Sequence, residues 1–129
     1  MRAYARETAF CLVYRNNMET DRQEDFLLFD EDKLTDTDKQ FCSQLVDFVS
    51  ANKQKIDDII SSYSKGFRLQ RLCKTDLAVL ETAIGEMMSC DTPFPVVINE
   101  AVGFAKKYST PKSASFVNGI LASYVRERQ

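Results

Sequence analysis

The chain has 129 residues, a hydrophobic content of 44% and a formal net charge of −2 at pH 7. This length fits one domain over residues 1–129, and the hydrophobic content excludes a disordered chain. No stretch approaches the roughly 18 apolar residues of a membrane span, and the N-terminal MRAYARETAF lacks the apolar segment of a signal peptide. The cytoplasm is therefore the expected location.

The N-terminal segment has the apolar spacing of a helix. Ala5, Ala9 and Leu12 fall on one stripe, which predicts a helix over about residues 3–16 with Arg6 off the stripe. An acidic segment follows, with nine acidic and two basic residues between positions 19 and 38. The apolar DFLLF within it predicts a short helix or a loop whose Phe26 docks on the body.

The chain outside the acidic segment carries a positive charge. The other residues hold 15 basic and 10 acidic side chains, an excess of +5. This distribution permits a basic surface despite the negative net charge, although it is not evidence that nucleic acid binds there.

Three further helical patterns follow before residue 90. Thr35 or Asp36 is a suitable N-cap for a second helix. A third helix carries Ile56, Ile59, Ile60 and Tyr63 on one face and is expected to end at Gly66. In the fourth, TDLAVLETAIGEMMSC, the apolar residues again share one face, with Thr75 as the expected N-cap.

The C-terminal part predicts two more helices. The first follows DTPFP, where Pro95 suits the first turn and Phe94 is expected to be extended because it precedes a proline. The second runs over about residues 112–126. No sustained alternation indicates a strand. We therefore predict an all-α, compact single-domain bundle of six to seven helices.

Polar residues interrupt the last two helical patterns. Asn99 and Glu100 lie at the rims of the apolar arc of their helix, where a side chain either bonds a neighbouring helix or meets water. Gly119 lies inside a helix at a cost of roughly 1 kcal/mol relative to alanine. We expect it to mark a point of close packing, and the pattern leaves open whether these residues bind anything.

The residues that carry most metal and general-base chemistry are scarce. The chain has no histidine, and its four cysteines, Cys11, Cys42, Cys73 and Cys90, include no CxxC pair. Zinc sites need clustered cysteine or histidine, and histidine is the commonest general base. Phosphate-loop and nucleophile-elbow motifs are also missing. We expect no metal, no cofactor and no enzymatic activity.

Four segments in order resemble one known family. PVVINEAVGFAKKY (95–108) followed by KSASFVNGIL (112–121) is similar to the signature of the NusB family, whose members are all-helical transcription antitermination factors. ARETAFCLVY (5–14) resembles the first helix of that family, and DLAVLETAIGEM (76–87) resembles its central helix. The resemblance covers essentially the whole chain.

The resemblance implies a non-enzymatic RNA-binding function. Members of the family pair with NusE, a ribosomal small-subunit protein, and together bind the single-stranded boxA element of ribosomal RNA transcripts. That assembly joins the RNA polymerase antitermination complex and supports processive transcription. No membrane is implied.

The resemblance also assigns candidate site residues. Those implied to contact RNA are Arg2, Tyr4, Arg6, Phe26, Tyr63, Lys112 and Phe116. Basic side chains bind phosphates and aromatic faces stack on bases in such interfaces, although Tyr4 and Phe116 are also compatible with a core role. Tyr14 and Asp76 correspond to the surface that faces NusE. Leu77 and Glu81 stand where many members have a basic residue, which predicts either weaker RNA binding without NusE or an altered boxA preference.

An alternative function is a protein-binding helical adaptor or a homodimer with weak RNA binding. The acidic net charge and the few N-terminal arginines favour it. A homodimer that covers the RNA surface occurs in some family members, so a homodimer is one of the expected partners.

Overall fold

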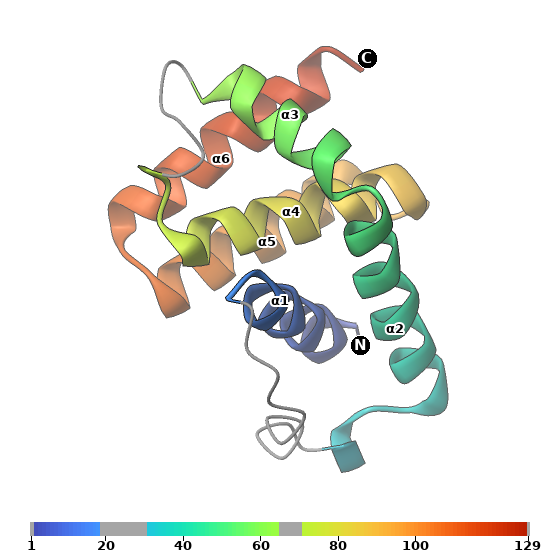
Figure 1. Cartoon of the computed structure of the whole chain (residues 1–129). Coiled ribbons are helices and arrows are strands. Elements are labelled where there is room, and N and C mark those ends of the chain that lie inside the picture. The colour runs from blue at the N-terminus through green and yellow to red at the C-terminus, as the bar shows by residue number, and fades with distance from the viewer. Residues whose placement is uncertain (1, 19–30, 65–70, 129) are drawn as a thin grey trace.

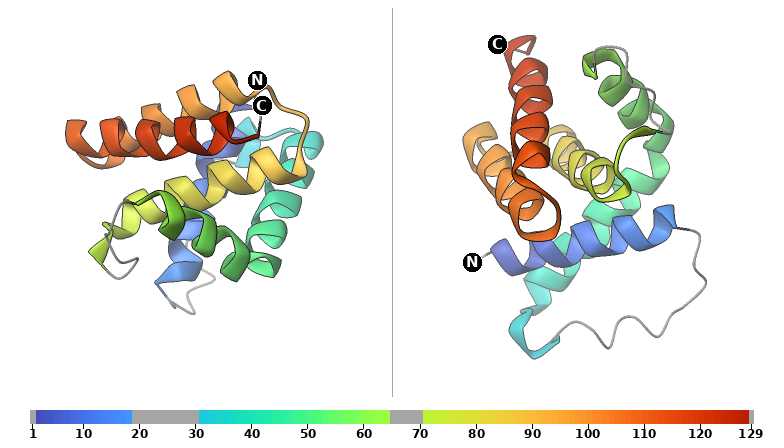
Figure 2. Two further views of the ribbon diagram at one scale, coloured as in Figure 1. Left: turned by 90° about the horizontal axis from the view of Figure 1, so that it is seen from above. Right: turned by 90° about the vertical axis from the view of Figure 1, so that its left-hand side faces the viewer.

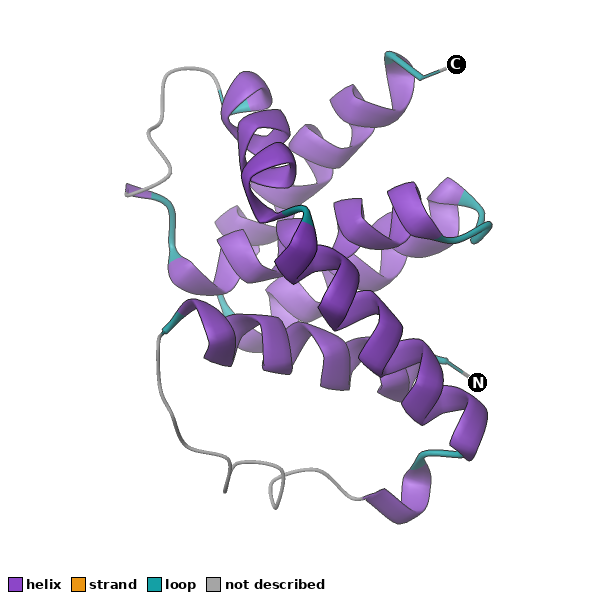
Figure 3. Ribbon diagram, turned by 45° about the vertical axis from the view of Figure 1, so that its right-hand side comes forward, coloured by secondary structure: helices purple, strands orange, loops and turns teal. Residues whose placement is uncertain are grey.

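The computed structural model describes residues 2–18, 31–64 and 71–128. These residues form α1 (Ala3–Asn17), η2 (Glu31–Lys33, a 3-10 helix), α2 (Asp36–Ala51), α3 (Lys53–Tyr63), α4 (Lys74–Ser89), α5 (Phe94–Tyr108) and α6 (Pro111–Arg126) (Figure 1). Only helices and connecting loops occur in the described ranges (Figure 3), which confirms the predicted all-α bundle. No helix in these ranges is long and apolar enough to cross a membrane.

Helix α4 is the centre of the bundle. The other five α-helices all pack against it, and α5 and α6 lie side by side (Figure 2). Every residue from Asp76 to Met87 is buried. The sequence predicted one apolar face for this helix, but a helix enclosed on all sides buries its polar residues too. Glu81 and Glu86 therefore need partners inside the protein.

Two helices start with a threonine cap, and the cap of α2 is the predicted one. Thr35 caps α2 with a capping box, because its hydroxyl accepts the Asp38 N–H at 3.0 Å and the Asp38 carboxylate accepts the Thr35 N–H at 3.2 Å. The Thr110 hydroxyl accepts the Ser113 N–H at 3.1 Å at the start of α6. Helix α3 ends at Tyr63, and Gly66 lies outside the described residues.

Two helix starts differ from the prediction. The N-cap of α4 is Cys73 rather than Thr75. Helix α5 begins at Phe94, and the extended residue is Pro93. The preference of a residue before proline for extended backbone is overcome here because Phe94 packs against the core.

The glycine that allows close packing is Gly85 and not Gly119. A Cβ on Gly85 would lie 2.6 Å from Val49 Cγ2, whereas a Cβ on Gly119 would meet nothing within 4 Å. The expectation for Gly119 was therefore wrong. Helix periodicity cannot show which helix approaches a given position.

Alanine substitutions at these two glycines are expected to act in opposite directions. Gly85→Ala should lower the free energy of unfolding by about 1–2 kcal/mol, because the clash with the short, buried Val49 side chain exceeds the gain in helix propensity. Gly119→Ala should raise it by up to about 1 kcal/mol. Urea denaturation of both variants measures this, and equal effects would contradict it.

Candidate nucleic-acid and partner surfaces

Arg6 lies inside the bundle. Its Nε donates to both carboxylate oxygens of Glu86 at 3.0 and 2.9 Å, and its Nη1 lies 3.6 Å from Glu100 Oε1. Arg6 is only 8% exposed. The resemblance implies that Arg6 contacts phosphate, but Glu86 and Glu100 already neutralise its guanidinium. Glu100 holds α5 to α1 at the predicted helix rim, while Asn99 is exposed.

A basic and aromatic cluster forms at the start of α1. The Arg2 guanidinium carbon lies 4.6 Å from the centroid of the Phe41 ring, and Lys33 Nζ lies 5.6 Å from that of Tyr4. Arg2 and Lys33 are exposed, Tyr4 is half-buried and Phe41 is buried. We call Arg2, Tyr4, Lys33 and Phe41 the N-terminal basic cluster. Its cations are held over aromatic faces and remain accessible.

Two members of this cluster, Lys33 and Phe41, were not predicted as site residues from the sequence. Lys33 belongs to the acidic segment, and Phe41 has the spacing of a core residue. No local signal connects either of them to Arg2 or Tyr4, because only the packing of α1 against α2 and η2 brings them together.

An open cavity adjoins the N-terminal basic cluster. Its volume is about 390 Å³, and its lining residues are Arg2, Thr37, Gln40, Phe41, Gln44, Cys90, Asp91 and Thr92. The glutamine amides and threonine hydroxyls offer both donors and acceptors. Such groups can bond the edges of unstacked bases while the basic side chains bind phosphates.

The other residues implied for RNA contact are not gathered at this cluster. Tyr63 lies at the end of α3, away from the N-terminus in Figure 1. Its hydroxyl donates to the Glu127 carboxylate, which raises the pKa of Tyr63, and its ring meets Tyr124 edge-on at 6.4 Å. Phe26 lies outside the described residues. Phe116 is half-buried and packs against the core.

Lys112 is exposed in the first turn of α6, and a charged contact joins α1 to the end of α5. Lys107 Nζ donates to Glu7 at 2.6 Å, and the Tyr108 hydroxyl donates to the same carboxylate. Burial raises the pKa of Glu7, but these two donors outweigh it and leave that pKa below its ordinary value. Lys106, Lys107 and Lys112 are all exposed, and of these three Lys107 is paired with Glu7.

The two residues implied to face NusE lie on two helices that pack together. Arg6 contacts Glu86 and Asn17 contacts Glu81, and α1 crosses α4 (Figure 2). Tyr14 is half-buried in the second half of α1, and Asp76 lies in the first turn of α4. Asp76 is 7% exposed, and its Oδ1 has no hydrogen-bond partner among the described residues.

Glu81 is the centre of a buried polar network that joins α1, α3 and α4. It accepts from Asn17 Nδ2 at 2.6 Å and from Lys53 Nζ at 2.7 Å, and Lys53 also donates to Asn17 Oδ1 at 2.7 Å. Because Glu81 is fully buried, the acid at this position is neutralised internally. It therefore presents no charge to an RNA.

Asp57 belongs to the same network. Lys53 Nζ lies 3.8 Å from its carboxylate. Burial raises the pKa of Asp57 to about 7, assisted by the hydrogen bond with Glu81 and by the charge of Glu81. Asp57 therefore keeps its proton up to near neutral pH.

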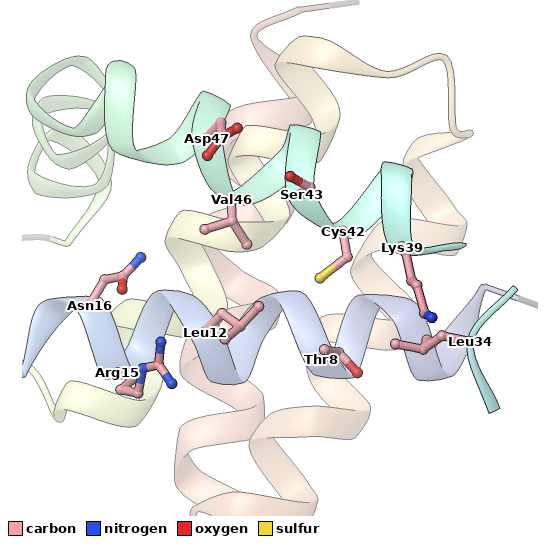
Figure 4. A pocket seen from close by; sticks show the side chains of 10 residues that line it. All are labelled: Thr8, Leu12, Arg15, Asn16, Leu34, Lys39, Cys42, Ser43, Val46 and Asp47. Atoms are coloured by element: carbon pink, nitrogen blue, oxygen red, sulfur yellow. The ribbon is translucent and has the colours of Figure 1, made fainter. Parts of the chain in front are cut away.

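A second cavity of about 390 Å³ lies between α1 and α2 (Figure 4). Its lining residues are Thr8, Leu12, Arg15, Asn16, Leu34, Lys39, Cys42, Ser43, Val46 and Asp47. None of the residues predicted to bind RNA or NusE lines it. Within the described ranges, no group of three or more histidine, cysteine or acidic side chains is placed to hold a metal ion.

Solved structures share this fold. "T. maritima NusB" has a TM-score of 0.87 and 31% identity, with 98% of this chain and 92% of that chain covered. The structure titled "Crystal Structure of Antitermination Factors NusB and NusE in complex with dsRNA" contains a chain with a TM-score of 0.83 and 24% identity, covering 98% of this chain and 96% of that one. The latter shows likeness of fold alone.

Sequence comparison gives the family. A transcription antitermination protein NusB from Acetivibrio thermocellus is 40% identical over 128 residues, which are 97% of this chain and 88% of that protein. One from Ruminiclostridium cellulolyticum is 40% identical over 124 residues, covering 94% and 86%. The model of the NusB family matches residues 3–126. The chain therefore belongs to the NusB family.

Proposed function

We propose that this protein is a transcription antitermination factor that binds boxA-type single-stranded RNA of ribosomal RNA transcripts together with NusE. It acts in the cytoplasm, at the RNA polymerase antitermination complex, without a catalytic step of its own. The relatives named transcription antitermination proteins support this function. The observation that carries it is the N-terminal basic cluster with its adjoining cavity, where exposed cations and amide groups occur together.

The proposed RNA contacts follow from exposure. Arg2 and Lys33 bind phosphates, because each is exposed and rests on an aromatic ring that restricts its motion. Lys112 adds a phosphate contact at the start of α6. Tyr4 offers its exposed portion to a base, and Phe26 is proposed for the same role. Arg6 acts indirectly, since its ion pair with Glu86 holds α1 in place.

Tyr63 and Phe116 have weaker structural support as RNA contacts. Tyr63 is engaged by Glu127 and Tyr124, and Phe116 packs against the core. An RNA that reached Tyr63 would have to extend to the far end of the molecule.

NusE is proposed to dock at Tyr14 and Asp76. The negative charge of Asp76 would complement a basic ribosomal protein and speed association. A protein of the same fold was crystallised with NusE and dsRNA, which makes NusE the partner to test first.

Substitution of the two exposed cations tests this function. Arg2→Ala with Lys33→Ala should weaken binding of a boxA-like RNA in the presence of NusE by about tenfold. It should also reduce the slope of log affinity against log salt by up to about 0.7 per lost phosphate contact. Fluorescence anisotropy at several salt concentrations measures both quantities. Lys55→Ala, an exposed lysine of α3, is the matched control and should bind as the unmodified protein does.

Two outcomes would contradict the proposal. One is RNA binding that is absent with and without NusE, and the other is binding without salt dependence. A stable homodimer in size-exclusion chromatography that RNA does not disturb would instead favour the helical adaptor.

A further inference from the structure

The cavity beside the N-terminal basic cluster contains an acidic residue that phosphate binding does not explain. Asp91 and Arg2 both line this cavity, and both are exposed. A carboxylate repels the phosphates that Arg2 and Lys33 attract. Within the described ranges, Asp91 takes part in no side-chain hydrogen bond and no ion pair. Its carboxylate is therefore available to a ligand that donates hydrogen bonds.

The end of α4 adds negative charge to the same side of the cavity. Asp91 follows Cys90, the C-cap of α4, and the last turn of this helix carries no basic residue. The C-terminus of a helix bears a partial negative charge, because its last carbonyl groups have no intrahelical donors. Cys90 and Thr92, the neighbours of Asp91 in the chain, line the cavity as well. This side of the cavity thus favours a donor over an anion.

Helix α2 contributes neutral polar groups to the cavity. Thr37, Gln40 and Gln44 follow one another at intervals of one turn, so they share one face of α2, and all three are exposed. The glutamine amides can donate to a carbonyl oxygen or to a ring nitrogen. The volume of about 390 Å³ falls within the range of small-ligand pockets, roughly 300–1,000 Å³.

Among the four RNA bases, guanine matches this combination of groups. Its Watson–Crick edge has two adjacent donors, the N1–H and the N2 amino group, and one carboxylate accepts both in parallel hydrogen bonds. Its O6 and N7 atoms accept hydrogen bonds from donors. Adenine and cytosine have one amino group on that edge, and uracil has one ring N–H. A carboxylate can therefore make only one such bond to each of these three bases.

We propose that this cavity selects a guanine base of the bound RNA and that Asp91 is the specificity-determining residue. The Asp91 carboxylate accepts from N1–H and from the N2 amino group, and the amides of Gln40 and Gln44 donate to O6 and N7. Arg2 and Lys33 hold the flanking phosphates. This inference rests on the proposed function, in which these two cations bind RNA, and adds a base preference to it.

The preference is measured by fluorescence anisotropy, in the presence of NusE, with oligouridines that differ only in one central base. That base is guanine, adenine or hypoxanthine, which keeps the N1–H of guanine but lacks its amino group. The guanine RNA should bind about tenfold more tightly than the adenine RNA and about threefold more tightly than the hypoxanthine RNA. Equal affinities for all three, with binding still weakened by Arg2→Ala and Lys33→Ala, would overturn this inference and leave the proposed function standing.

Asp91→Asn tests the assigned residue. The variant should bind the three RNAs about equally, because an asparagine side chain has one acceptor oxygen and cannot accept both guanine donors. The matched control is Asp47→Asn, at an exposed acid of α2 that does not line this cavity, and it should keep the guanine preference. Both substitutions remove one negative charge, so a general electrostatic effect would be the same in both. A guanine preference that persists in Asp91→Asn would overturn the assignment.

Binding of NusE separates the remaining outcomes. In isothermal titration calorimetry, Asp91→Asn should bind NusE as the unmodified protein does. Loss of NusE binding in this variant would assign the Asp91 carboxylate to a donor of the protein partner, which would overturn this inference. Oligouridines and a boxA-like RNA that all fail to bind, with and without NusE, would instead overturn the proposed function, and this inference with it.

Discussion

Glu86→Gln is expected to lower the free energy of unfolding by about 3–5 kcal/mol. The Glu86 side chain is 2% exposed and accepts both bonds from Arg6 Nε. A neutral glutamine would leave the Arg6 guanidinium buried with only the more distant Glu100, and removing one partner of a buried ion pair typically costs that much. Urea denaturation at 25 °C measures the change, which is a large fraction of the stability of a small domain.

Glu100→Gln is the matched control for this prediction. Glu100 approaches the same guanidinium at 3.6 Å and is 26% exposed, so its loss should cost no more than about 1 kcal/mol. Equal effects of the two substitutions would contradict the assignment of Glu86 as the principal partner. The result also bears on RNA experiments, because an Arg6 variant that loses RNA binding would first have to be shown to remain folded.

We expect Asp57 to make a contribution to the free energy of unfolding that decreases as the pH rises from about 4 to about 7. The pKa of Asp57 is about 7 in the folded protein, against an ordinary value of 3.8 for an aspartate. In this window the folded state keeps a proton that the unfolded state has lost, so the unfolded state gains relative stability as pH rises. The slope approaches about 1.4 kcal/mol per pH unit. The contribution is complete below pH 4 and lost above pH 7.

Comparison with Asp57→Asn isolates this component from the titration of other carboxylates. The free energy of unfolding of Asp57→Asn minus that of the unmodified protein should increase between pH 4 and 7 and be constant above pH 7. A pH-independent difference for Asp57→Asn would show that Asp57 titrates normally.

These buried networks connect the fold to the proposed surfaces. Arg6 fixes the first half of α1 to α4 and α5, and Asn17 fixes its end to Glu81. The N-terminal basic cluster therefore stands on a helix held at both ends. Tyr14, between these two anchors, has its position set relative to α4 in the same way.

Local chemistry made much of the fold predictable. The apolar spacing placed the first helix within one residue of its observed end, and Thr35 capped its helix as expected. Helix starts at Cys73 and Phe94 were missed because neither residue carries a strong capping signal, and tertiary packing decided where each helix began.

The sequence by itself determined the number and order of the helices and the family, because apolar periodicity and short motifs depend on neighbouring residues. Only the tertiary structure decided which charged side chains stay exposed and unburdened by a buried ion pair, and so can contact a ligand. Arg6 and Glu81 have the spacing of polar surface positions, yet packing around α4 buries both and pairs them with residues 28 to 80 positions away. Lys33 belongs to the acidic segment in the sequence, but the packing of the chain places it over Tyr4 in the N-terminal basic cluster. Burial and ion pairing depend on which helices meet, and one-dimensional periodicity does not contain that information.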